Sequence, residues 1–143
     1  MIYIASDHAG YKFKEELKKY LTDLGFEFED LGNKELDPDD DYVDFAFKLA
    51  ENVIQKKEKG VLLCGTGSGM ALAANKVKGI RAVNCWNEEM AKQARDHLDS
   101  NILCLGEKIL NLETAKNILK VWLNTDFSKK ERHNRRIKKI DNF

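Results

Sequence analysis

Short apolar runs alternate with longer amphipathic stretches along the chain, and this alternation restricts the possible folds more than any other feature. The apolar runs have the length of β-strands and occupy residues 2–5, 26–31, 60–63, 80–85 and 102–105. The stretches 12–24, 42–56 and 112–123 place apolar side chains on one helical face. Such alternation is typical of βα units stacked on a parallel sheet. We therefore expect an α/β fold, with Gly25, Gly60 and Gly79 as C-cap glycines between helices and strands.

The chain has 143 residues, the usual length of one domain, so we expect a single domain over residues 1–143. No apolar run approaches the roughly 20 residues that span a bilayer, and the N-terminus lacks the features of a signal peptide. These observations predict a cytoplasmic protein with no membrane partner.

Charge is balanced overall but not along the chain. The 24 basic residues equal the 24 acidic ones, yet residues 128–143 hold seven basic and two acidic side chains. This segment is expected to be a basic C-terminal helix or arm. Six acids fall within residues 35–44, which predicts a solvated loop. Overall neutrality, and a basic segment without interleaved aromatics, argue against a nucleic-acid partner.

A glycine-rich loop, Cys64-Gly65-Thr66-Gly67-Ser68-Gly69, follows one apolar run and precedes a helix start. Its backbone N–H groups can bind a phosphate or stabilise an oxyanion formed during a reaction. The loop lacks the Lys-Ser/Thr of a P-loop, and it does not follow the first strand as a dinucleotide fingerprint does. A Cys-x5-Arg phosphatase would need arginine at the position of Met70.

Among the three cysteines, only Cys64 lies where a thiolate is favoured, beside this loop and near a helix start. Cys85 and Cys104 lie in or after apolar runs and are expected to be reduced core residues, so no disulfide is predicted. Asp7 and His8 follow the first strand, at the edge of the sheet where ligands bind. Without His-x-x-x-His or Cys-x-x-Cys spacing, we expect no metal site.

Five features of the chain together match one known family. They are Ser6-Asp7-His8-Ala9-Gly10, the Cys64–Gly69 loop, the run 73–82, His97 and Arg132-His133-x-x-Arg136. With these features the chain resembles ribose-5-phosphate isomerase type B. The match runs in order over almost the whole chain. This family also includes allose- and galactose-6-phosphate isomerases. The resemblance implies a Rossmann-like doubly wound parallel sheet of about five strands with helices on both faces. It also implies a homodimer or dimer of dimers, with sites at the interface, that interconverts ribose 5-phosphate and ribulose 5-phosphate without a cofactor.

The resemblance also implies roles for individual residues. Cys64 would be the base that carries the proton between C1 and C2, and His97 would transfer the ring proton. Asp7 would bind hydroxyls and assist ring opening. The remaining predicted site residues would bind the enediolate, the sugar or the phosphate: His8, Tyr42, Gly65, Thr66, Gly67, Ser68, Gly69, Leu98, Lys108, Arg132 and Arg136, with Thr66 also beside the base. Independently, Arg132 and Arg136 lie four residues apart, so on a helix they could hold one phosphate.

Three positions depart from the family pattern. Leu98 stands where asparagine is usual, Lys108 where arginine is frequent, and Val43 where proline is common. Some members use a glutamate base at the position of Met70, so this chain belongs with the cysteine type. Because Leu98 leaves substrate preference open, the main alternative is an isomerase of allose 6-phosphate or galactose 6-phosphate. An alternative from another class is a non-catalytic module that binds sugar phosphates.

Overall fold

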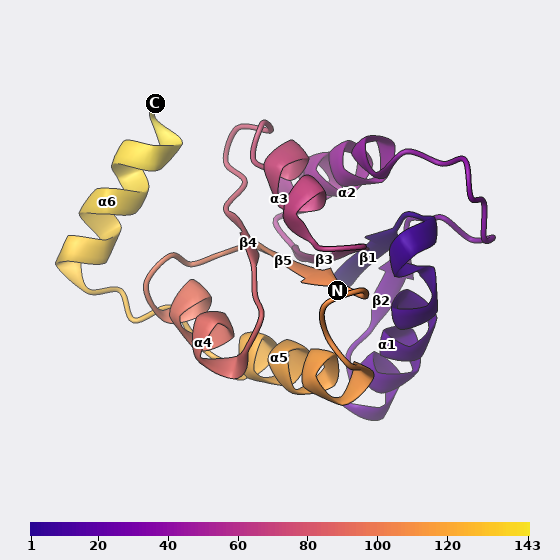
Figure 1. Ribbon diagram of the computed structural model, residues 1–143. Helices are drawn as coiled ribbons and strands as arrows, with labels where there is room; N and C mark the ends of the chain where they lie inside the picture. Colours follow the sequence, from indigo (N-terminus) through magenta and orange to yellow (C-terminus); the bar gives the residue numbers. More distant parts are fainter.

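The computed structural model describes residues 1–143 and has a parallel five-stranded sheet at its centre (Figure 1). The strands are β1 (Ile2–Ser6), β2 (Phe28–Asp30), β3 (Lys59–Cys64), β4 (Ala82–Asn84) and β5 (Ile102–Gly106). Their order across the sheet is β2-β1-β3-β5-β4. The three inner strands are buried, as expected for a sheet that helices cover on both faces.

Two apolar cores lie on opposite faces of this sheet. The helices are α1 (Tyr11–Asp23), α2 (Tyr42–Lys56), α3 (Ser68–Ala74), α4 (Glu88–Asp96), α5 (Leu112–Asn124) and α6 (Glu131–Asp141). One core contains α2 and α3, with Leu49 and Met70 packed beside Leu62 of β3. The other contains α1, α4 and α5, with Leu17 and Trp122 packed beside Leu63. The expected α/β fold with helices on both faces is therefore confirmed.

Helix α4 is absent from the sequence predictions because its apolar signal is weak. Its buried residues are Ala91, Ala94 and Arg95, none of them a large apolar side chain. The helix begins at a good cap instead, where Asn87 Oδ1 accepts the N–H of Met90 at 2.8 Å.

The prediction for Gly60 is wrong. Gly60 lies within β3, and Lys57 adopts the left-handed conformation that ends α2. A Cβ at position 60 would collide with the side chain of Leu49, so the glycine lets α2 pack closely on the strand. Gly25, by contrast, follows the end of α1 at a φ of +84°, as predicted.

Helix α6 forms in the predicted basic segment and stands apart from the layers around the sheet (Figure 1). Few contacts anchor it to the rest of the chain. Asp141 Oδ2 lies 2.9 Å from Arg81 Nη1, and Ser128, just before the helix, donates to the carbonyl of Asp96 at 2.8 Å. None of the helices has the length and apolar character needed to cross a membrane.

Candidate active site

A hollow of about 380 Å³ opens at the carboxyl ends of β1, β3 and β5. From β1 the chain turns outward to β2 and then returns to the other side as β3. Open α/β sheets bind ligands at such a switch point. The hollow brings together most of the predicted site residues, which we call the Cys64 cluster: Asp7, His8, Tyr42, Cys64, Gly65, Thr66, Gly69 and Lys108, with Ala9 beside them.

The glycine loop is held by hydrogen bonds of its own. Cys64 ends β3, and the N–H of Gly67 donates to its Sγ at 3.1 Å. The N–H of Ser68 donates to Thr66 Oγ1 at 3.3 Å, and Asn84 Nδ2 donates to the Thr66 carbonyl at 3.0 Å. Gly67 is buried against Asn84 with a φ of +82°, so it supports the loop from behind. The sulfur is thus fixed at the edge of the hollow.

Two glycines of the loop allow other side chains to approach it. A Cβ on Gly69 would lie 2.8 Å from the ring of Tyr42, and a Cβ on Gly65 would lie 3.2 Å from Lys108 Cδ. The phenol of Tyr42 and the stem of Lys108 therefore pack directly against the backbone. This contact places a hydroxyl and a cation beside Cys64, as a site for a polar anionic ligand requires.

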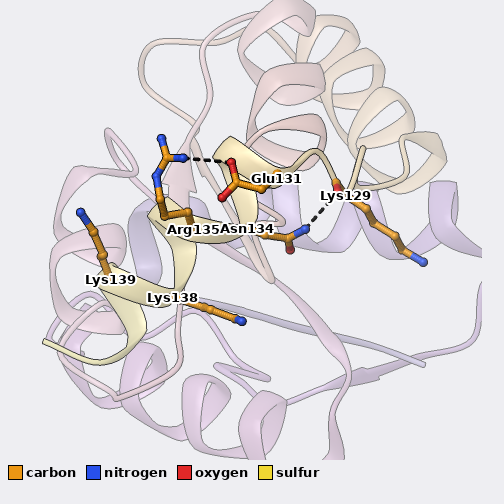
Figure 2. A pocket seen from close by; sticks show the side chains of 6 residues that line it. All are labelled: Lys129, Glu131, Asn134, Arg135, Lys138 and Lys139. Atoms are coloured by element: carbon orange, nitrogen blue, oxygen red, sulfur yellow. Dashed lines mark hydrogen bonds and ion pairs between the residues drawn. The ribbon is translucent and has the colours of Figure 1, made fainter.

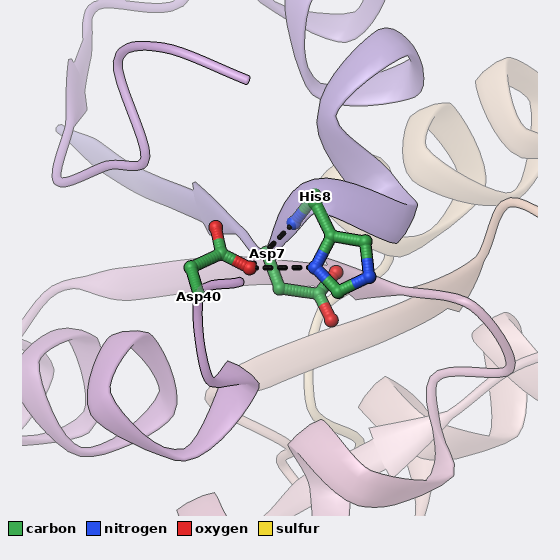
Figure 3. Close-up of side chains that lie close together, drawn as sticks. All are labelled: Asp7, His8 and Asp40. Carbon is green, nitrogen blue, oxygen red and sulfur yellow. Dashed lines mark hydrogen bonds and ion pairs between the residues drawn. The ribbon is translucent and has the colours of Figure 1, made fainter. Parts of the chain in front are cut away.

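The end of β1 supplies an acid and an imidazole. Asp7 Oδ1 accepts the N–H groups of Ala9 at 3.0 Å and Gly10 at 3.1 Å. Burial raises the pKa of Asp7 against the opposing effect of these hydrogen bonds and of His8. His8 Nδ1 lies 2.7 Å from Asp40 Oδ1, as Figure 3 shows, and this contact raises the pKa of His8. Asp7 and His8 can therefore transfer a proton and bind an anion.

Asp40 is missing from the sequence-based site. It belongs to the acidic segment that was expected to be solvated, yet its side chain is only 6% exposed. No spacing singles it out from the neighbouring acids, and it lies 32 residues from His8. Ligand atoms of Asp7, His8 and Asp40 lie within 4.8 Å of one another, a geometry that could hold a metal ion. The expectation of a metal-free site stays a prediction.

Gly67 and Ser68 lie in the loop itself, and the remaining predicted residues lie elsewhere. His97 follows α4, and its ring stacks on that of His133 in α6, with centroids 4.4 Å apart. Arg132 and Arg136 are exposed on α6. Leu98 lines a separate hollow of about 240 Å³ that includes apolar side chains of β4 and α6. We call these residues the His97 cluster: His97, Leu98, Arg132, His133 and Arg136. Within one chain, none of them lines the Cys64 hollow.

His133 is the least exposed member of the His97 cluster. Its Nε2 is buried without a hydrogen-bond partner. Burial lowers the pKa of His133, and the nearby His97, Arg132 and Arg136 lower it further. The His133 ring that stacks on His97 is therefore protonated less readily than an exposed histidine, while Arg132 and Arg136 lie at the surface.

The largest hollow of the molecule, about 530 Å³, is on the outer face of α6 (Figure 2). Its lining is wholly hydrophilic and includes Lys138, Lys139 and Arg135. Arg135 is already paired with Glu131 at 2.9 Å. The lining contains no cysteine, no histidine and no predicted site residue, so the smaller hollow beside Cys64 is the better candidate for an active site.

Comparison with known proteins finds similar sequences and structures over nearly the whole chain. Residues 2–140 match the family described as Ribose/Galactose Isomerase. A probable ribose-5-phosphate isomerase B of Mycoplasma genitalium is 41% identical over 97% of this chain and 92% of its own length. The solved structure of ribose-5-phosphate isomerase B from that organism, with bound ribulose 5-phosphate, superposes with a TM-score of 0.94, at 40% identity over 99% of this chain and 93% of that one.

A relative with another sugar substrate in its name is also similar. The D-erythrulose-4-phosphate isomerase 2 of Mycolicibacterium smegmatis is 38% identical over 88% of this chain and 85% of its own length.

Proposed function

Because this chain belongs to the ribose/galactose isomerase family, we propose that it interconverts ribose 5-phosphate and ribulose 5-phosphate through an enediolate. The observation that carries the proposal is the Cys64 sulfur, which the Gly67 N–H holds at 3.1 Å in a hollow shared with Asp7, His8 and Lys108. A sugar phosphate isomerase needs a base, an oxyanion site and cations for the phosphate. The hollow contains candidates for all three.

In the proposed reaction, the Cys64 thiolate removes the proton from C2 of the open-chain aldose. The electron pair of the broken C–H bond forms the C1–C2 double bond, and the carbonyl oxygen on C1 becomes an oxyanion. The thiol then returns the proton to C1, the hydroxyl on C2 loses its proton as its oxygen forms the new carbonyl, and the oxyanion on C1 takes up that proton to become a hydroxyl. Since the N–H groups of Gly67 and Ser68 are used inside the loop, we assign the oxyanion to those of Gly65, Thr66 and Gly69.

Ring opening and phosphate binding are assigned to the remaining site residues. Asp7, whose pKa burial raises, takes part in proton transfer during ring opening together with His97. His8 binds the phosphate with Arg132 and Arg136. Tyr42 and Lys108 contact the sugar, since both side chains pack on the loop beside Cys64.

This assignment requires two copies of the chain, because the His97 cluster does not reach the Cys64 hollow of its own chain. We propose a homodimer, or a dimer of dimers, in which α6 of one subunit brings Arg132 and Arg136 to the hollow of the other. The projection of α6 away from the sheet supports this arrangement (Figure 1). A location in the cytoplasm stays a prediction.

The test is the conversion of ribose 5-phosphate by EDTA-treated protein. Cys64→Ala removes the base and should lower kcat by about 10³-fold. Cys85→Ala is the matched control, because burial raises the pKa of the Cys85 thiol to about 12 and the residue belongs to the core on the other face of the sheet. Wild-type protein that forms no ribulose 5-phosphate, or a Cys64→Ala variant with full activity, would contradict the proposal.

Leu98 and the family description favour a second candidate, an isomerase of allose 6-phosphate or galactose 6-phosphate. An apolar side chain at position 98 cannot make the polar contact of the usual asparagine to the sugar. We therefore propose to compare kcat/KM for four-, five- and six-carbon sugar phosphates. Leu98→Asn should shift these ratios toward ribose 5-phosphate if position 98 contacts the sugar.

A further inference from the structure

The carboxylate of Asp40 holds His8 at two points. Its Oδ1 accepts the backbone N–H of His8 at 3.0 Å and lies 2.7 Å from the ring Nδ1. Its Oδ2 accepts a hydrogen bond from Asn33 Nδ2 at 3.2 Å. The side chain of Asp40 is 6% exposed, against 39% for that of His8. Both oxygens of Asp40 are thus engaged inside the protein, while the ring they hold remains open to solvent.

We propose that Asp40 is a positioning residue, which orients the His8 ring and keeps it cationic so that its Nε2–H can bind the phosphate of the substrate. The identity of the anion rests on the function proposed above. The contact between Asp40 and His8 does not depend on it.

The orientation follows from hydrogen-bond chemistry. A carboxylate can only accept, so Nδ1 must carry its proton toward Asp40. Nε2 then lies on the opposite side of the ring, away from Asp40 (Figure 3). If Nε2 is also to donate a hydrogen bond to an anion, both ring nitrogens must be protonated and His8 must be an imidazolium.

The charges around His8 favour this cationic state. The hydrogen bond to Asp40 is the main cause that raises the pKa of His8, and it outweighs partial burial. Asp7, at the end of β1, adds to the increase, whereas Lys108, after β5, opposes it. A phosphate monoester loses its second proton near pH 6. A raised pKa therefore keeps His8 charged at pH values where the phosphate is a dianion.

The segment that carries Asp40 is tied to the same end of β1. The N–H of Asn33 donates to the Ser6 carbonyl at 2.8 Å, and the N–H of Ser6 donates to the Gly32 carbonyl at 2.8 Å. Asn33, fixed in this way, also holds Asp40 through its side chain. The carboxylate is therefore placed over His8 by the fold and not by chance contact of an exposed loop.

The first test is an NMR titration of the ligand-free protein in EDTA. The chain has only three histidines, and His8→Gln assigns the His8 signals. Asp40→Asn keeps the size of the side chain and removes its charge, so the pKa of His8 should fall. The matched control is Asp39→Asn, which removes one charge from an exposed neighbour and should leave that pKa unchanged. An unchanged His8 pKa in Asp40→Asn would overturn the proposal.

A second measurement needs no variant at Asp40. In wild-type protein above the pKa of His8, the ¹⁵N shifts of the ring should show the proton on Nδ1. A proton on Nε2 instead would overturn the proposal even if Asp40→Asn fails to fold.

The third test separates binding from chemistry. Asp40→Asn should weaken binding of inorganic phosphate, and raise KM for ribose 5-phosphate, by about tenfold at pH 7.5, the effect of losing one charge-assisted hydrogen bond. The value of kcat should change by less than about twofold, because His8 does not touch the reacting carbons. Unchanged phosphate affinity would contradict the role of Asp40. Phosphate binding that depends on Asp40, in a protein that isomerises no sugar, would instead contradict the proposed function alone.

Discussion

The residues of the Cys64 cluster are held firmly in place, whereas those of the His97 cluster are held loosely. In the first, short hydrogen bonds between buried or half-buried groups fix the Cys64 sulfur, Asp7 and His8 at the end of the sheet. In the second, Arg132 and Arg136 project into solvent from a helix with few contacts to its own chain. The difference shows that one chain preorganises Cys64, Asp7 and His8 but leaves His97 and the two arginines proposed to bind the phosphate outside the hollow.

The ion pairs in these two parts of the molecule also differ in how deeply they are buried. Near the Cys64 cluster, Lys14 is fully buried and contacts Asp30 at 2.6 Å, with Lys18 at 2.8 Å from the same oxygen. Asp30 also accepts the N–H of Gly32 at 2.8 Å. Behind the His97 cluster, the pair of Arg81 with Asp141 lies at the periphery, and the carboxylate is 32% exposed. The first arrangement ties α1 firmly to β2, whereas the second constrains α6 less.

The largest effect is expected when each cluster is inactivated in a different subunit. Cys64→Ala alone and Arg132→Ala/Arg136→Ala alone should each be nearly inactive. After the two proteins are mixed and allowed to exchange subunits, half of the dimers are hybrids in which one of the two sites is intact. The mixture should recover about a quarter of the wild-type rate. The measurement is the rate of ribulose 5-phosphate formation.

The control mixes Cys64→Ala with Cys64→Ala/Arg132→Ala/Arg136→Ala, a pair that cannot form an intact shared site. No recovery in the first mixture, with subunit exchange confirmed by mass spectrometry, would mean that each site is built within one chain. The division into two clusters would then have no functional meaning.

A smaller effect is expected on stability. Asp30→Asn removes the nearer carboxylate from the buried ammonium of Lys14, which keeps only Glu15 at 3.2 Å, and should lower the free energy of unfolding by about 3 kcal/mol. Asp141→Asn breaks a peripheral pair and should cost less than about 1 kcal/mol. Chemical denaturation measures both, with the exposed Asp23→Asn as a control. Equal losses at positions 30 and 141 would show that the two clusters are anchored alike.

The pH dependence of stability provides an independent check on Asp30. Burial alone would raise the pKa of Asp30, but Lys14 and Lys18 outweigh this effect and lower it. The carboxylate therefore stabilises the fold above its ordinary pKa near 3.8, and this contribution is lost as the pH falls. Asp30→Asn should be less sensitive than the wild type to acidification in this range.

Local patterns in the sequence predicted the layers of the fold, the Cys64–Gly69 loop and the position of Asp7 and His8 after the first strand, whereas Tyr42 was expected only from the family resemblance. Apolar runs identified all five strands, and the Cys64–Gly69 loop lies where its glycines indicated. Helix α4 was missed because it buries alanines and an arginine side chain, which give little periodic signal. Gly60 was misread because a glycine required for close packing looks the same in the sequence as one that ends a helix.

The rest of the site depends on contacts that no local pattern encodes. Asp40 becomes a partner of His8 only because the segment after β2 folds back over β1. The stacking of His97 on His133 likewise joins α4 to α6 across more than thirty residues. The sequence could indicate which residue types were present, but not which of several acids would be buried.

The smallest expected effect concerns adjacent arginines on α6. Arg135 lines the charged hollow on the outer face of the helix and is paired with Glu131 (Figure 2). Arg136 belongs to the His97 cluster. Arg136→Ala should lower kcat/KM for ribose 5-phosphate by about 10- to 100-fold, because a charge-assisted contact to the phosphate is lost. Arg135→Ala removes the same charge one residue away and should change kcat/KM by less than about twofold, because an exposed ion pair contributes little.

If the two variants lost activity equally, the general positive charge of α6 would attract the substrate, and the distinction between its two faces would fail. A steep dependence of both rates on salt concentration would accompany that outcome, whereas a specific contact at Arg136 predicts a difference between the variants that persists at high salt.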